Sequence, residues 1–267
     1  MNKNYVHGYS ERENIRLQDQ AMTLVELLHS DSIFAAGSNL LEVGCGVGAQ
    51  TITLARNNPE INITALEISG TSIKQAKNLI ESEGITNVTF HQGDIFNLPY
   101  KEKSFDHIFV CFVLEHLADP VEVLRVLKNY IKHGGEITII EGDHGSTYFY
   151  PDSNYAEEVI KCQVELQKRN GGNANIGREL YPLLKKAGYK SISVSPRMVY
   201  VDGNKPALIE GFTKNTFTAM IEGIRESAIS KGLIEKKSFD QGINDLYRTA
   251  GEDGVFCYTF FKAVATV

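Results

Sequence analysis

The sequence predicts an α/β fold, a doubly wound and mostly parallel sheet with helices on both faces. Short apolar segments alternate with amphipathic helical segments from residue 39 to about 143. A glycine-rich turn, GCGVG, follows the first apolar segment, where open parallel sheets admit ligands. The chain has 267 residues, of which 42% are hydrophobic, enough for one sizeable core. We therefore expect a single domain over residues 1–267.

The first element expected is a helix. Ser10 and Glu13 have the spacing of a capping box, and apolar residues at helical intervals continue to about His29. Five buried strands are expected at 39–43, 61–68, 88–91, 105–111 and 136–141. Three intervening helices are expected. The first follows the glycine turn, the second runs from Ser69 or Thr71 to Gly84, and the third runs from Asp119-Pro120 to Gly134-Gly135.

The C-terminal part departs from this alternation. Residues 191–201 and 255–267 are rich in Val, Tyr, Phe and Thr and are separated by a mostly helical stretch. We expect the two strands to pair antiparallel at one edge of the sheet. The helical insertion, about 205–250, is then expected to form a lid over a pocket.

Composition narrows the function classes. The net charge of −6 disfavours a nucleic-acid partner, because no overall positive field is available to hold a phosphate backbone. The four cysteines are far apart in the sequence, so we expect no metal centre and a reducing, cytoplasmic location. The longest apolar run, 108–114, is much shorter than the roughly 20 residues that span a bilayer, so no membrane partner is expected.

The glycine turn and an acid downstream indicate a nucleoside ligand. Gly44, Gly46 and Ala49 fit the G-x-G-x-x-G/A pattern, although this pattern alone also fits a purely structural turn. Glu67 ends the second strand, where a carboxylate can accept hydrogen bonds from both hydroxyls of a ribose. Both features suit the adenosine of a nicotinamide cofactor or of S-adenosylmethionine (SAM).

Five segments occur in order between Asn39 and about Asp143: LLEVGCGVGAQT, the acid in ALEIS, GDIFNLPY, FDHIFVCFVLEHLADP and GGEITIIEGD. Together they resemble the class I SAM-dependent methyltransferases, specifically the small-molecule branch, which implies a Rossmann-like fold and SAM as cofactor. The resemblance implies these contacts: Gly44 and Gly46 beside the methionyl group, Glu67 at the ribose, Ile68, Asp94 and Ile95 at the adenine, and Cys111 and Glu42 at the methionyl amino group. For Ile68, Ile95 and Cys111, simple core packing remains the alternative.

The resemblance extends to the N-terminal segment YVHGYSERENIRLQDQ. In similar proteins this segment folds over the cofactor, so a covering helix is expected at about 1–30. Tyr9 and Arg16 are the candidate contacts, since a guanidinium matches the cofactor carboxylate with two parallel hydrogen bonds. A solvated helix arginine is the alternative.

A methyl acceptor with an O–H or protonated N–H group can require a base. His116 and His144 are the candidates, because they follow the fourth and fifth strands at the edge that faces the cofactor. Tyr148, Tyr150 and Arg178 are the candidate substrate-binding residues, suited to an aromatic or polar small molecule. The predicted function is methyl transfer from SAM to an O, N or C nucleophile of such a molecule. An NAD-dependent oxidoreductase and a SAM-binding regulatory protein without turnover remain alternatives.

Overall fold

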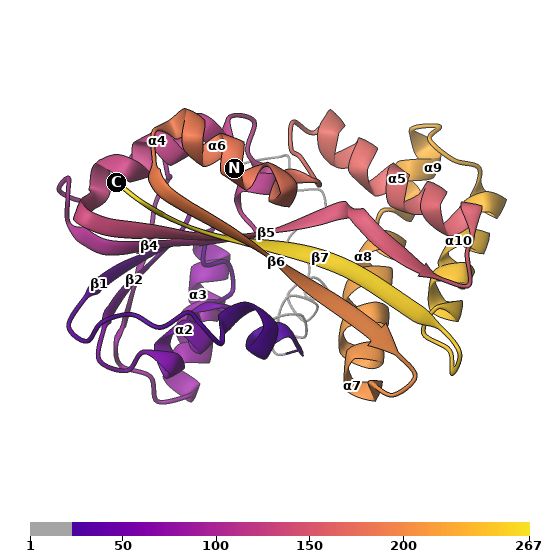
Figure 1. Ribbon diagram of the computed structural model, residues 1–267, viewed down its shortest axis with the longest axis horizontal. Coiled ribbons are helices and arrows are strands. Elements are labelled where there is room, and N and C mark those ends of the chain that lie inside the picture. Colours follow the sequence, from indigo (N-terminus) through magenta and orange to yellow (C-terminus); the bar gives the residue numbers. More distant parts are fainter. Residues whose placement is uncertain (1–22) are drawn as a thin grey trace.

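A computed structural model describes residues 23–267, which form a seven-stranded sheet with helices on both faces (Figure 1). The strands are β1 (Asn39–Val43), β2 (Asn62–Glu67), β3 (Val88–Gln92), β4 (Phe105–Cys111), β5 (Ile131–Tyr150), β6 (Lys190–Asp202) and β7 (Val255–Thr266). Their order is β3-β2-β1-β4-β5-β7-β6, in which β1 to β5 are parallel and β7 is antiparallel to both β5 and β6. The predicted fold class and the antiparallel C-terminal strands are confirmed. Strand order reverses between β1 and β4, which is where ligands bind in such sheets.

Two helices of the first half, α3 (Gly70–Ser82) and α4 (Pro120–Tyr130), begin at the capping residues that the sequence predicts. The other helical elements of this half are residues 23–29, α2 (Thr51–Asn57) and the 3-10 turn η1 (Leu114–His116). The Ser69 hydroxyl accepts a hydrogen bond from the Ser72 amide at 3.2 Å, and the Asp119 carboxylate accepts one from the Glu122 amide at 3.0 Å. Each cap satisfies an amide that the first helical turn leaves without a partner.

The second half is mainly helical between its strands. Its elements are α5 (Asn154–Arg169), η2 (Ile176–Glu179), α6 (Leu180–Ala187), α7 (Pro206–Leu208), the π-helix η3 (Ile209–Thr218), α8 (Ala219–Gly223), α9 (Arg225–Ser230) and α10 (Lys236–Arg248). The last five lie between β6 and β7. With α5 they gather at one end of the molecule (Figure 1).

The core lies on both faces of the sheet because strand side chains alternate between them. Leu40 and Phe109 pack with helix 23–29, α2, α5 and the insertion, whereas Leu41 and Ile108 pack with α4 and α6. This two-sided burial explains why the central strands read as continuous apolar runs rather than as alternating ones.

Three element predictions were wrong or incomplete. Helix α4 ends at Tyr130, not at the glycine pair, and β5 covers 20 residues rather than 136–141. β5 is long because it pairs with β7 from Glu136 to Tyr150, with a register shift between Asp143 and Tyr148. Helix α5 follows and was not predicted. A long antiparallel pairing is set by a distant partner strand, which local patterns do not encode.

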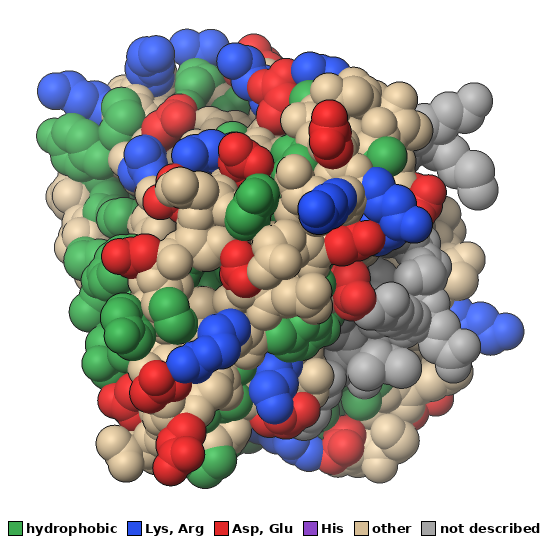
Figure 2. All heavy atoms as spheres, turned by 90° about the vertical axis from the view of Figure 1, so that its right-hand side faces the viewer, with side chains coloured by type: hydrophobic (Ala, Val, Ile, Leu, Met, Phe, Trp, Pro, Cys, Tyr) green, Lys and Arg blue, Asp and Glu red, His purple; other side chains and the backbone are tan. Residues whose placement is uncertain are grey.

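The outer part of β5, β7 and β6 differs between its two faces. On one face, Phe256 and Tyr258 of β7 pack against Phe212 and Phe217 of η3. The opposite face exposes large apolar side chains, and hydrophobic residues gather along the left edge of Figure 2. This exposed set is Tyr148, Tyr150, Met198 and Tyr200. Among residues 23–267, no helix has the length and apolar character to cross a bilayer.

Candidate active site

The first two glycines of the turn after β1 lie in different surroundings. Gly44 and Gly46 have φ of +72° and +53°, in the left-handed region that favours glycine. A Cβ on Gly44 would lie 2.5 Å from Cγ2 of Val113, so this glycine admits the loop after β4. A Cβ on Gly46 would meet nothing within 4 Å among the described residues. Gly46 is therefore the place where a ligand could approach the backbone.

Glu67 at the end of β2 lies against the same turn. Its carboxylate accepts hydrogen bonds from the amides of Gly46 at 3.1 Å and Ser69 at 2.9 Å. A carboxylate has about four acceptor positions, so these two amides leave capacity for two ribose hydroxyls. The structure thus brings Glu67 to the glycine turn, as its proposed role requires.

Glu42 is a buried acid at the base of the turn. It is 2% exposed, and its Oε2 makes no hydrogen bond within residues 23–267. Burial raises the pKa of Glu42 to about 7, although the nearby Thr51 hydroxyl opposes this shift. A buried carboxyl group with unused acceptor capacity fits a cationic ligand group, directly or through water. The amino group of SAM is such a group.

The residues expected at the adenine lie in the neighbouring loops. Ile68 is 44% exposed at the end of β2, which is unusual for an isoleucine in simple core packing. The carboxylate of Asp94 accepts a hydrogen bond from the Phe96 amide at 3.0 Å, and Ile95 is partly buried. Phe96 is exposed in the same loop, although the sequence analysis did not single it out. These side chains could bracket a flat ring.

Cys111 is the last residue of β4, and His116 lies in the loop that follows. Cys111 is buried, so only its backbone could serve a ligand. His116 ends η1, and its Nε2 lies 3.7 Å from the carboxylate of Glu115. The structure thus pairs His116 with an acid and places it one short helical turn beyond the rim.

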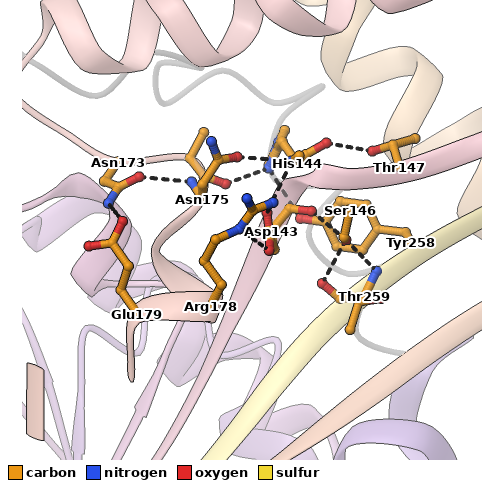
Figure 3. Close-up of polar contacts among 12 residues, drawn as sticks. Asp143, His144, Ser146, Thr147, Asn173, Asn175, Arg178, Glu179, Tyr258 and Thr259 are labelled. Carbon is orange, nitrogen blue, oxygen red and sulfur yellow. Dashed lines mark hydrogen bonds and ion pairs between the residues drawn. The ribbon is translucent and has the colours of Figure 1, made fainter. Parts of the chain in front are cut away.

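His144 lies within the outer part of β5, and not after that strand as the sequence predicted, inside a polar network (Figure 3). Its Nδ1 is 3.1 Å from the Ala174 carbonyl and 3.1 Å from the Tyr258 hydroxyl. Because a carbonyl only accepts hydrogen bonds, Nδ1 carries the proton in the neutral ring, and Nε2 is the basic atom. The rings of Phe217 and Tyr258 flank the imidazole at 6.0 and 5.6 Å. His144 therefore faces the insertion with a defined tautomer.

Arg178, expected to bind substrate, is held by Asp143 (Figure 3). Its Nε and one Nη each donate to Asp143 at 2.6 Å, a bidentate pair that raises the pKa of Arg178. The Asp143 side chain is 2% exposed and that of Arg178 is 49% exposed. Arg178 thus neutralises a buried acid, and only its remaining N–H groups could reach an acceptor.

Tyr148 and Tyr150 are not brought together with His144. Phe149 between them packs into the core that contains η3, so the alternation of β5 directs both tyrosines to the opposite face. The Tyr148 hydroxyl instead lies 3.3 Å from the Met198 sulfur. Two further candidates, Tyr9 and Arg16, lie outside the described residues.

Besides Phe96, two residues of the site were not identified from the sequence. Glu141 is fully buried on β5, and Tyr258 contacts the His144 ring from β7. An acid inside the apolar run TIIEGD was a usable signal, because a buried acid requires partners. Tyr258 offered no signal, since aromatic residues are common throughout β7.

Comparisons with known proteins identify the family. The profile of a family described as "Methyltransferase domain" matches residues 35–188. An uncharacterized methyltransferase of Schizosaccharomyces pombe is 31% identical over 53% of this chain and 52% of its own length. The 27-O-demethylrifamycin SV methyltransferase of Amycolatopsis mediterranei is 28% identical over 51% of this chain and 50% of its own. The chain spans about half the length of these relatives.

Solved structures share the fold. Phosphoethanolamine N-methyltransferase 2 of Haemonchus contortus, in complex with SAM, has a TM-score of 0.56 and 16% identity, over 93% of this chain and 52% of that one. Geranyl diphosphate C-methyltransferase of Streptomyces coelicolor, in complex with S-adenosylhomocysteine (SAH), has a TM-score of 0.51 and 15% identity, over 93% and 78%. At these identities the likeness concerns the fold alone.

Proposed function

The chain belongs to the class I SAM-dependent methyltransferases, and we propose that it transfers a methyl group from SAM to a small molecule. The observation that carries the proposal is the rim of the sheet around Gly46. There an accessible glycine backbone, the Glu67 carboxylate and the buried Glu42 lie at the strand-order reversal. These three groups fit the methionyl, ribose and amino parts of one ligand.

When bound, SAM supplies a methyl group already activated on its sulfonium. The protein therefore has to hold the acceptor in line and exclude water, without making an electrophile. Gly44 and Gly46, Glu67 and Glu42 would hold the cofactor, and Ile68, Asp94 and Ile95 would contact its adenine. The backbone of Cys111 would meet the amino end. Over residues 1–30, the N-terminal segment with Tyr9 and Arg16 would cover it.

His144 is the proposed general base. Its Nε2 would take the proton of a hydroxyl acceptor as the bond from oxygen to the methyl carbon forms and the bond from that carbon to sulfur breaks. With a protonated amine acceptor, Nε2 would take the proton before the amine nitrogen attacks. The Ala174 carbonyl holds the other ring nitrogen in its protonated form, which keeps Nε2 basic. Such a base contributes about 10²–10⁴-fold to rate. His116, paired with Glu115, is the second candidate.

The acceptor is proposed to be a small aromatic or polar molecule with a hydroxyl or amine. Buried aromatic residues of η3 and β7 flank His144, which suits an enclosed pocket rather than an open groove. The relatives of this chain include 27-O-demethylrifamycin SV methyltransferase and ajmaline N-methyltransferase, both of which act on small molecules.

The test has two stages. Thermal unfolding of the full chain is measured with SAH, with NAD and without ligand; saturating SAH is expected to raise Tm by about 5 °C, and NAD to leave it unchanged. Methyl-labelled SAM is then incubated with fractionated small-molecule extracts, and the labelled product is identified by mass spectrometry. Stabilisation by NAD instead of SAH would favour an oxidoreductase. SAH binding without turnover on any fraction would favour a regulatory protein.

A further inference from the structure

Glu141 is a fully buried acid whose hydrogen bonds go to the loop after β4. One carboxylate oxygen, Oε1, accepts from the Val113 amide at 3.0 Å and from the Leu114 amide at 2.7 Å. The other oxygen has no hydrogen bond within residues 23–267. Burial and the adjacent charge of Glu115 both raise the pKa of Glu141. The carboxyl group accepts at Oε1 whether it is ionised or protonated.

The loop that Glu141 holds has a strained backbone and presses on the glycine turn. Phe112 has φ of +57°, a left-handed conformation that costs a non-glycine residue about 1 kcal/mol or more. Its amide donates to the Ile140 carbonyl at 2.9 Å. The Val113 side chain fills the space that a Cβ on Gly44 would need. Contacts to β5 therefore maintain a conformation that the loop alone would not favour.

A second set of contacts fixes the far end of the same loop. The Glu115 carbonyl accepts from the Asn173 amide at 2.8 Å and from Nε2 of Gln167 at 3.1 Å. That Nε2 also lies 2.8 Å from the Glu115 carboxylate. The loop is thus held between β5 on one side and the end of α5 on the other.

We infer that Glu141 is a positioning residue for cofactor binding, acting through the amides of Val113 and Leu114 on the backbone that follows Cys111. It fixes this backbone against the glycine turn, where the methionyl end is proposed to lie. The inference rests on the proposed function, since the loop position affects affinity only if the cofactor binds beside it.

Two substitutions separate the hydrogen-bond acceptor from the charge. Glu141→Gln keeps an acceptor at Oε1 and resembles the protonated acid, whereas Glu141→Met fills similar space without a carboxyl acceptor. Glu141→Met is expected to weaken SAH binding tenfold or more in calorimetry and to raise KM for SAM more than it lowers kcat. Glu141→Gln is expected to stay within about threefold of the wild type, because its amide oxygen still accepts the two backbone hydrogen bonds. Hydrogen exchange at Val113 and Leu114 is expected to accelerate only in Glu141→Met.

A core variant of β5 controls for general destabilisation. Ile137→Val removes one methyl group from a fully buried side chain outside the loop and is expected to leave SAH affinity unchanged. Equal SAH affinity in wild type and Glu141→Met would overturn the inference, as would equal losses in the Gln, Met and Ile137→Val variants. If the wild type itself fails to bind SAH, the proposed function fails as well, and the two failures are therefore distinguishable.

Discussion

The buried acids in two regions of the rim have different kinds of partner. Beside the glycine turn, Glu42 has no ion pair within residues 23–267, and Glu67 accepts hydrogen bonds from backbone amides. In the outer part of β5, Asp143 is neutralised by a bidentate Arg178. The first region retains capacity for a positively charged ligand, and the second is already balanced. This difference supports SAM, with its sulfonium and ammonium, beside the glycine turn and a less charged acceptor beside the outer part of β5.

The largest expected effect is on the acceptor side. His144→Ala is expected to lower kcat by about 100-fold or more, the usual contribution of a general base, with SAH affinity within about twofold. The matched control is His133→Ala, at an exposed histidine that lies on the surface and contacts Lys103. Turnover equal to the wild type in His144→Ala would remove this residue from the mechanism and leave His116 as the candidate.

The next largest effect is expected on stability, from the ion pair between Asp143 and Arg178. Arg178→Ala leaves the buried Asp143 carboxylate without its cation, so the free energy of unfolding is expected to fall by about 2 kcal/mol. Arg169→Ala breaks a pair of similar length, 2.7 Å to Glu165, in which both side chains are exposed. That control is expected to cost less than about 1 kcal/mol. If urea denaturation showed equal losses of unfolding free energy in Arg178→Ala and Arg169→Ala, the burial of Asp143 would not affect the contribution of its ion pair to stability.

The buried Glu42, which has no ion pair within residues 23–267, predicts that both stability and SAH affinity depend on pH. In the folded protein without cofactor, the pKa of Glu42 is about 7, whereas its value in the unfolded chain is near 4.5. The contribution of Glu42 to the free energy of unfolding is therefore lost as the pH rises from about 4.5 to about 7. Above that range this contribution no longer changes with pH. Since ionised Glu42 favours the cofactor amino group, SAH affinity is expected to rise about tenfold from pH 6 to 8. Calorimetry of Glu42→Gln should show a flat profile, and a profile as steep as that of the wild type would contradict this role.

The smallest expected effect distinguishes the two faces of the outer sheet. Tyr148→Ser with Tyr150→Ser is expected to change kcat/KM by less than about twofold, because both rings lie on the face opposite the insertion and surface substitutions have small effects. Phe217→Leu is the comparison, since this ring lies beside His144. A large loss in the double tyrosine variant would restore these residues as substrate contacts.

The same contrast explains what the sequence could predict. In the first half of the chain, strand ends, capping residues and glycines are local features, so β1 to β4, Ser69, Asp119 and the position of Glu67 followed from pattern alone. The extension of β5 depends on its pairing with β7, more than 100 residues away. The contact of Tyr258 with His144 depends on that pairing, and the hydrogen bonds of Glu141 depend on the pairing of β5 with β4. Local patterns do not encode them.

The central claim is that SAM binds where the Gly46 backbone is open, and calorimetry with SAH tests it most directly. Gly46→Ala and Gly84→Ala are matched: both glycines have positive φ, of +53° and +66°, and a Cβ on either would meet no described atom within 4 Å. Both variants are expected to lose about 1 kcal/mol of stability through backbone strain. Only Gly46→Ala should also weaken SAH binding, by tenfold or more. Equal SAH affinity in the two variants would contradict the account.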